Sequence, residues 1–97
     1  MRLSARYVPA FAKSVKRFNK KHMDMRPHNA VLELILQNDV QSSEALRNRH
    51  NMHVLTGNQA GYKERQIANA GDWLPIWTND GTSAYFERTG THEEIFR

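Results

Sequence analysis

The sequence predicts an α+β fold, in which two N-terminal helices pack on one face of a curved, mainly antiparallel sheet of about four strands. Two observations lead to this prediction. Apolar residues recur at helical spacing through the first third of the chain, whereas from residue 53 onward they form short β-like runs separated by Gly or Asn. Helices and strands in separate blocks of a chain are typical of α+β domains. The 97 residues are expected to form one domain over 1–97.

The first helix is expected over 10–22, after a short edge strand over 6–9 that Pro9 ends. Phe11, Val15 and Phe18 are spaced by four and then three residues, so they form a single apolar stripe. Basic side chains occupy much of the remaining surface, which makes this helix amphipathic and strongly basic. They are Lys13, Lys16, Arg17, Lys20 and Lys21.

A second helix is expected after Asp24 and Pro27, because both residues suit the start of a helix. This helix is apolar on most of its circumference, so it should be the better buried of the two. It is expected to end at 37–39. The polar stretch 40–52 is expected to contain no more than one short helical turn, at 43–47. The apolar residues of the second helix are Val31, Leu32, Leu34, Ile35 and Leu36.

Short β-like runs follow, each bounded by turn signals. The clearest turn is the hairpin at 79–82, where Gly81 can adopt a positive φ. Pro75 conflicts with a regular ladder because proline has no N–H to donate, so an edge, a bulge, or a backbone position directed away from a neighbouring strand is expected there. The expected strands span 53–56, 61–67, 73–78 and 83–89.

The charge of the chain is unevenly distributed. Residues 1–26 carry eight Lys or Arg and one acid, whereas 27–97 carry six basic and nine acidic residues. A basic first quarter favours a polyanion or an acidic protein as partner, although a solvated helix face accounts for it equally well. The absence of cysteine excludes disulfides and thiolate metal sites, and with no secretory pattern it favours a reducing cytoplasm. The longest apolar run, at 31–36, is too short to span a membrane.

The C-terminal segment carries side chains suited to handling RNA. Arg88 can hold a phosphate, His92 can exchange a proton near neutral pH, and Phe96 can stack on a base. His53 opens the β half of the chain and His92 closes it, so in an antiparallel meander the two can converge on one rim of the sheet.

The other histidines suggest no site. His22 lies near the end of the basic helix, and His28 lies at the start of the second helix and needs no functional explanation. His50 and His53 have the spacing of a metal pair, but nothing nearby in sequence completes a ligand set, so no metal site is expected.

Four motifs occur in order along the chain: His53-Val54-Leu55-Thr56-Gly57, Gly61-Tyr62-Lys63-Glu64, Asp72-Trp73-Leu74, and Phe86-Glu87-Arg88-Thr89-Gly90-Thr91-His92 with Ile95-Phe96 after it. Together they resemble the YafQ branch of the RelE-type bacterial toxins. The last motif is the most specific, and the other three gain weight from their order and spacing. The resemblance covers most of residues 10–97, with the helical half matching in pattern alone.

The resemblance implies an endoribonuclease toxin that cleaves messenger RNA on the ribosome by acid–base chemistry, without metal or other cofactor. It places active-site residues at His53, Asp72, His92 and Phe96, and it assigns Arg88 to the arginine before the terminal motif. Contacts with RNA or the ribosome are expected from Lys63, Arg65, Gln66 and the basic residues of the first helix. The implied partner is an acidic antitoxin, in a heterotetramer that binds operator DNA in the cytoplasm, with no role for a membrane.

The sequence departs from the family pattern at one point. A family histidine has no counterpart here; Gln66 is nearest, and the stretch 66–71 is slightly longer than the family pattern. Glutamine forms hydrogen bonds but cannot exchange a proton at neutral pH. Two alternatives therefore stay open: a catalytically weakened toxin fold that acts with its antitoxin in operon repression, and a gyrase-directed inhibitor of the same superfold.

Overall fold

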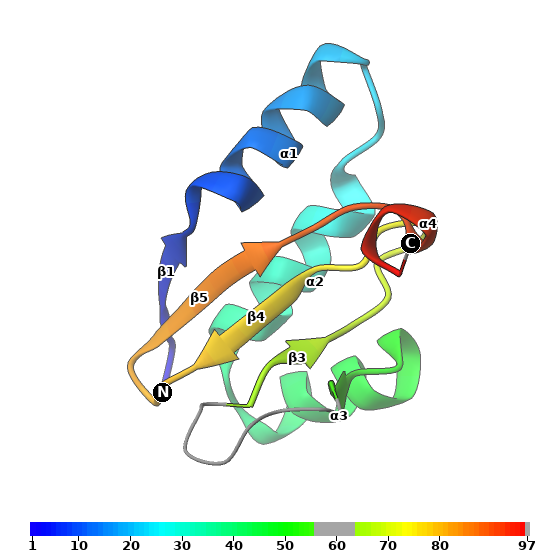
Figure 1. Ribbon diagram of the computed structural model, residues 1–97. Coiled ribbons are helices and arrows are strands. Elements are labelled where there is room, and N and C mark those ends of the chain that lie inside the picture. Colours follow the sequence, from blue (N-terminus) through cyan, green and yellow to red (C-terminus); the bar gives the residue numbers. More distant parts are fainter. Residues whose placement is uncertain (56–63, 97) are drawn as a thin grey trace.

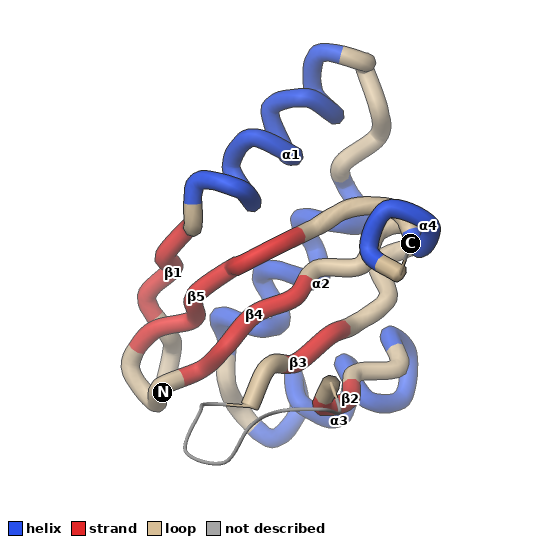
Figure 2. Tube along the Cα trace, viewed as in Figure 1, coloured by secondary structure: helices blue, strands red, loops and turns tan. Residues whose placement is uncertain are grey.

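A five-stranded mixed sheet with the strand order β1-β5-β4-β3-β2 forms the centre of the protein (Figure 1). The computed structural model describes residues 1–55 and 64–96. Helices α2 and α3 lie behind the sheet, and α1 packs against β5 (Figures 1 and 2). The α+β class predicted from the sequence is confirmed. In chain order the elements are β1 (Ser4–Tyr7), α1 (Pro9–Lys20), α2 (Arg26–Gln37), α3 (Val40–His50), β2 (His53–Val54), β3 (Gln66–Ile67), β4 (Ile76–Asn79), β5 (Ser83–Arg88) and α4 (His92–Ile95).

Helix α1 follows the predicted apolar stripe. It begins at Pro9, whose fixed φ suits the first helical position. Phe11 and Phe18 are buried and Val15 is half-buried, as the spacing predicted. The helix ends at Lys20, slightly earlier than expected, and His22 then takes a positive φ of 56°.

Helix α2 is the better buried of the first two helices, as predicted. It buries four residues, whereas α1 buries two. Asn38, in the left-handed conformation with φ 51°, ends the helix. The buried residues of α2 are His28, Val31, Ile35 and Leu36.

Helix α3 shows that the prediction of a single helical turn in 40–52 was wrong. An eleven-residue helix forms there and packs against α2. Asp39 starts it with a capping box: its side chain accepts a hydrogen bond from Ser42 N at 2.7 Å, and Ser42 Oγ accepts one from Asp39 N at 3.0 Å. Leu46 is its only large buried apolar residue, so the sequence lacks the apolar stripe by which helices are usually predicted.

The sheet is antiparallel except at one edge. Strand β1 pairs with β5 in parallel, from Ser4 opposite Ser83 to Tyr7 opposite Phe86. The short edge strand was predicted, but it begins earlier than 6–9, and its parallel pairing was not foreseen. Of the strand expected at 61–67, Gln66–Ile67 is present, while residues 61–63, like Thr56 of the first run, lie outside the described residues.

Strand β4 begins at Ile76, directly after Pro75, so the proline is not in the ladder. A register irregularity between Ile76 and Trp77 follows, which matches the bulge expected near this proline. Trp73, expected to open this strand, instead forms isolated bridges with Ala70 and Thr91. The hairpin at 79–82 forms as predicted, with Gly81 at φ 92°.

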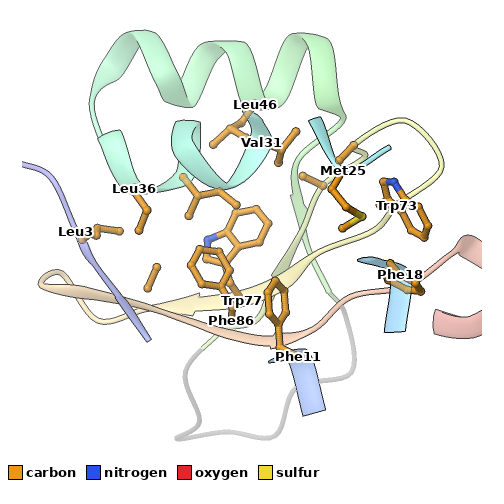
Figure 3. Close-up of a cluster of buried hydrophobic side chains, with 14 residues drawn as sticks. Leu3, Phe11, Phe18, Met25, Val31, Leu36, Leu46, Trp73, Trp77 and Phe86 are labelled. Carbon is orange, nitrogen blue, oxygen red and sulfur yellow. The ribbon is translucent and has the colours of Figure 1, made fainter. Parts of the chain in front are cut away.

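The main core lies between the sheet and its helices. Figure 3 shows Trp77 and Phe86 of the sheet facing Val31 and Leu46 of the helices. Phe86 is fully buried, and its ring centroid lies 5.4 Å from that of Phe11. Burying such an aromatic side chain stabilises the fold by about 1.5–3 kcal/mol. In the part of the chain that the structure describes, no helix is long and apolar enough to cross a membrane.

Candidate active site

The segment between β5 and α4 is held by backbone contacts with the loop that precedes β4. Gly90 O accepts a hydrogen bond of 2.8 Å from Leu74 N, and Thr91 bridges to Trp73. These contacts hold the backbone immediately before His92 against the loop that precedes β4. The backbone of the terminal motif is therefore paired with the loop before β4 at the residues that immediately precede His92.

Helix α4 presents His92 to solvent. A capping box starts the helix: Thr91 Oγ1 accepts from Glu94 N at 3.3 Å, and Glu94 Oε1 accepts from Thr91 N at 3.1 Å. The hydrogen bond from Thr91 N lowers the pKa of Glu94, and so does its ion pair with Arg17. His92 is exposed, and its ring centroid lies 4.9 Å from that of Phe96. The imidazole and the stackable ring thus lie side by side.

Asp72 lies at the tip of a tight turn. Ala70 and Trp73 exchange both backbone hydrogen bonds, at 2.8 and 3.1 Å, and leave only Gly71 and Asp72 between them. Gly71 has a positive φ of 64°, which an L side chain rarely adopts. The turn leaves the Asp72 side chain exposed, at the end of the loop that is bonded to the terminal motif.

Asp72 and His92 share one cleft of about 480 Å³. The structure therefore brings together two of the predicted catalytic residues, which are twenty positions apart in sequence. A carboxylate and an imidazole that line the same space can serve as two acid–base groups on one bound substrate. The other residues that line the cleft are Met23, Asn69, Gly71, Trp73, Leu74, Thr91 and Glu93.

His53 lies at the same end of the sheet but on a different strand. The pairing register puts His53, Ile67, Ile76 and Arg88 in one row across β2, β3, β4 and β5. Three steps of about 4.8 Å separate the ends of that row, so the His53 and Arg88 backbones are about 14 Å apart. The His53 Nδ1–H donates to Asn51 O at 2.7 Å, which leaves Nε2 as the proton acceptor of the neutral ring. Among the described residues that line the Asp72–His92 cleft, His53 does not appear.

Arg88 faces a second hollow, of about 410 Å³, on the other side of the terminal motif. Thr89 lies in its wall, whereas Thr91 and His92 line the first cleft, so the chain between them separates the two spaces. Arg88 is thus close to His92 in sequence, but the two residues line different hollows. The hollow is lined by Ala10, Ser14, Arg17, Arg88, Thr89 and Glu94.

His28 is a residue to which sequence reasoning gave no role. It is fully buried in α2, and its Nε2 lies 2.9 Å from Oγ1 of the buried Thr89. No described residue provides a hydrogen-bond partner for its Nδ1, and burial lowers the pKa of the imidazole. The signal in the sequence was its spacing, since His28, Val31 and Ile35 lie on one face of a helix. The neutral His28 ring, on α2, thus contacts the terminal motif at Thr89.

The predicted basic face of α1 is exposed. Lys13, Lys16, Lys20 and Lys21 lie at the surface, where a polyanion can reach them. Arg17 differs from these lysines because its guanidinium pairs with Glu94 of α4.

Of the RNA contacts expected from the middle of the chain, neither Arg65 nor Gln66 lines the Asp72–His92 cleft. Lys63 lies outside the described residues, and Arg65 is exposed. Gln66 is opposite the buried Trp77, whereas its neighbour Ile67 is opposite His53. Directly opposed residues share a face of a sheet, so Gln66 and His53 point to opposite faces.

The two histidines with metal-pair spacing are occupied by backbone hydrogen bonds. His50 Nδ1–H donates to Asn69 O at 2.9 Å, and His53 Nδ1–H donates to Asn51 O. Within 1–55 and 64–96, no three His, Asp or Glu side chains are grouped closely enough to hold a metal ion.

Comparison with known proteins places this architecture in a family. Residues 3–97 match the family described as the bacterial toxin of type II toxin–antitoxin systems, YafQ. The mRNA interferase toxin YafQ of Escherichia coli K12 is 29% identical over 90 residues, which cover 93% of this chain and 91% of that protein.

Solved structures agree with the sequence match. In the crystal structure of the E. coli DinJ–YafQ toxin–antitoxin complex, a chain with 26% identity superposes with a TM-score of 0.77 and full coverage of both chains. A chain of the archaeal RelE–RelB complex from Pyrococcus horikoshii has the same fold, with a TM-score of 0.65 at 14% identity, over 94% of this chain and 96% of that one. The resemblance noted in the sequence is confirmed, and the protein belongs to the YafQ family of toxins of bacterial type II toxin–antitoxin systems.

Proposed function

We propose that this toxin is an endoribonuclease that cleaves messenger RNA on the ribosome, without a metal ion. The observation that carries the proposal is the cleft in which Asp72 and the exposed His92 face the same space, with the Phe96 ring against the imidazole. The E. coli relatives are named mRNA interferase toxins, which supports the same activity.

The reaction is an internal transfer at phosphorus. A base takes the proton of the ribose 2′-OH, the 2′-oxygen bonds to the adjacent phosphorus, and the bond from phosphorus to the 5′-oxygen breaks. An acid then supplies a proton to the departing 5′-oxygen, which leaves a cyclic phosphate and a free 5′-hydroxyl. Each general acid or base contributes about 10²–10⁴-fold to the rate.

His92 provides one of these proton transfers. Asp72, in the same cleft, either orients the His92 imidazole or accepts the second proton, and His53, with its open Nε2, is the other candidate for that proton. Phe96 stacks on a base of the messenger, and Arg88 neutralises charge on the RNA backbone beside the cleft.

The partners follow from the family and from the charge distribution. An antitoxin partner is supported by the DinJ–YafQ and RelE–RelB complexes, and the basic α1 suits an acidic one. We place a toxin–antitoxin heterotetramer on operator DNA and the free toxin on the ribosome, both in the cytoplasm. The lysines of α1, together with Lys63, Arg65 and Gln66, then contact ribosomal RNA or the messenger.

A second candidate function is a binding module that acts only with its antitoxin. It is favoured by Gln66, the residue nearest to a family histidine that has no counterpart here, and by the altered loop before Asp72. Gln66 also lies on the sheet face opposite His53. A gyrase-directed inhibitor of the same superfold is the third, since that activity needs none of the acid–base residues.

Induction of the chain in bacteria, without its antitoxin, separates these functions. Growth arrest with cleaved transcripts is the result expected here. Arrest with a DNA-damage response and intact transcripts would favour the gyrase inhibitor, and unimpaired growth with normal protein levels would favour the binding module. Co-expression of the antitoxin should restore growth in the first case.

A further inference from the structure

The hollow beside Arg88 is built from three separate parts of the chain. One wall is the face of α1 that carries Ala10, Ser14 and Arg17, which recur at intervals of four and three residues. Arg88, the last residue of β5, the following Thr89, and Glu94 of α4 complete the lining. The lining is mainly polar and includes two guanidinium groups and the Ser14 hydroxyl, whereas the Thr89 hydroxyl is already bonded to His28.

The charges in this hollow do not balance. Arg17 is paired with Glu94, but within the described residues the Arg88 guanidinium has no hydrogen-bonded or ion-paired partner. Two cations therefore face one anion. Guanidinium groups bind phosphate in a planar, two-pronged geometry, and the half-buried Ser14 hydroxyl can donate to one of its remaining oxygens.

We propose that this hollow is a subsite for a phosphodiester group of the RNA that lies across His92, and that the Glu94 carboxylate occupies its Arg17 side in the free toxin. Arg17 is then a binding residue distinct from the lysines of α1, because it faces the hollow together with Arg88. The inference rests on the proposed function, since it assigns part of the substrate to a second space beside the catalytic cleft.

The Arg17–Glu94 pair can give way at little cost. The side chain of Arg17 is 48% exposed and that of Glu94 is 35% exposed. Ion pairs as exposed as this one contribute about 0–1 kcal/mol to stability. The other oxygen of Glu94 stays bonded to Thr91 N, so α4 keeps its cap when the pair opens. Glu94 therefore competes with a phosphate for Arg17 without being needed there to hold the helix.

Binding of a non-cleavable RNA tests the subsite. The probe is a fluorescent single-stranded RNA with 2′-O-methyl groups, which carries phosphates but has no nucleophile, and affinity is measured by anisotropy at low salt. Glu94→Gln keeps an amide oxygen for Thr91 N but removes the charge. The matched control is Glu33→Gln, which removes one charge from another exposed Arg–Glu pair, with Arg2 at 2.6 Å, outside the hollow.

We expect Glu94→Gln to tighten binding by about two- to five-fold beyond the effect of Glu33→Gln, the change that one exposed charge pair supplies. Arg17→Gln should weaken binding and lower the slope of log K against log salt by about 0.7, the value for one phosphate contact on a single strand. In the Arg17→Gln background, the extra gain from Glu94→Gln should disappear, because that gain acts through Arg17.

Several outcomes overturn the subsite. Equal effects of Glu94→Gln and Glu33→Gln, unchanged affinity in Arg17→Gln, or weaker binding in Glu94→Gln would each mean that the pair only ties α4 to α1. Cleavage of ribosome-bound messenger by the wild type is measured separately. If the wild type cleaves while these binding effects are absent, only the subsite is wrong; if they are present without cleavage, the subsite stands and the nuclease proposal fails.

Discussion

The buried His28 should make the stability of this protein depend on pH. Burial lowers the pKa of His28, so the folded protein keeps the ring neutral where the unfolded chain, with a pKa of about 6.5, takes up a proton. The unfolded state then binds more protons, and the free energy of unfolding falls as the pH falls below about 6.5. Well above that pH, His28 is neutral in both states and contributes no pH dependence.

The magnitude has an upper limit. One proton corresponds to about 1.36 kcal/mol per pH unit, so between pH 6.5 and 5.0 the loss from His28 is at most about 2 kcal/mol. This is a large share of the 5–15 kcal/mol typical of a whole domain. The other described histidines are exposed or half-buried, and a comparison of two variants at each pH removes their common contribution.

The assay compares the wild type with His28→Gln, which can still hydrogen-bond to Thr89 but does not titrate. Urea unfolding is followed through the fluorescence of Trp73 and Trp77 at several pH values between 7.5 and 5.0. We expect the wild type to lose stability relative to His28→Gln as the pH falls, by up to about 2 kcal/mol. A constant difference between the two proteins over this range would mean that the His28 ring is equally protonated in the folded and unfolded states, contrary to this expectation.

Three further predictions concern the fold and the basic helix. Phe86→Ala should cost about 3–5 kcal/mol in the free energy of unfolding by urea, because the ring is fully buried; a loss below 1 kcal/mol would contradict the described core. Asp39→Ala removes the cap of α3 and should cost about 1 kcal/mol by the same measurement, with reduced helical circular dichroism. Charge reversal at Lys13 and Lys16 should weaken ribosome association in sedimentation assays and should make that association less dependent on salt concentration. Unchanged association would mean that these lysines form only a solvated face.

Local patterns in the sequence were enough to predict most of the fold. The spacing of Phe11, Val15 and Phe18 identified α1 and its buried face, and the Gly81 turn identified the β4–β5 hairpin. Helix α3 was missed because its stability comes from the Asp39 cap and from packing on α2, neither of which gives an apolar period. The parallel pairing of β1 with β5 was missed because it joins the two ends of the chain, and no local pattern records it.

For the candidate site, too, local sequence patterns predicted some features, whereas contacts between residues distant in sequence were not predicted. The terminal motif drew attention to Arg88, His92 and Phe96, and the structure adds that Asp72 shares a cleft with His92 while Arg88 faces another space. The pairing of Arg17 with Glu94 spans 77 positions, so spacing alone could not predict it. The same holds for His28 beneath Thr89, which depends on how α2 packs under the end of β5.

In the proposed reaction, His92 transfers a proton during cleavage of messenger RNA on the ribosome. The most direct test is the cleavage rate of a defined messenger bound to purified ribosomes, measured for the wild type and for His92→Gln. The amide keeps some hydrogen bonding but cannot supply a proton on demand, and His92 lies at the surface with few core contacts, so fold stability should be little changed.

We expect His92→Gln to bind ribosomes as the wild type does but to cleave more slowly by about two or more orders of magnitude, the contribution of one general acid or base. His92→Ala should show a similar loss. Near-normal cleavage by His92→Gln, with ribosome binding intact, would contradict the claim. It would mean that His92 only positions the RNA and that the proton transfers belong to His53 or Asp72.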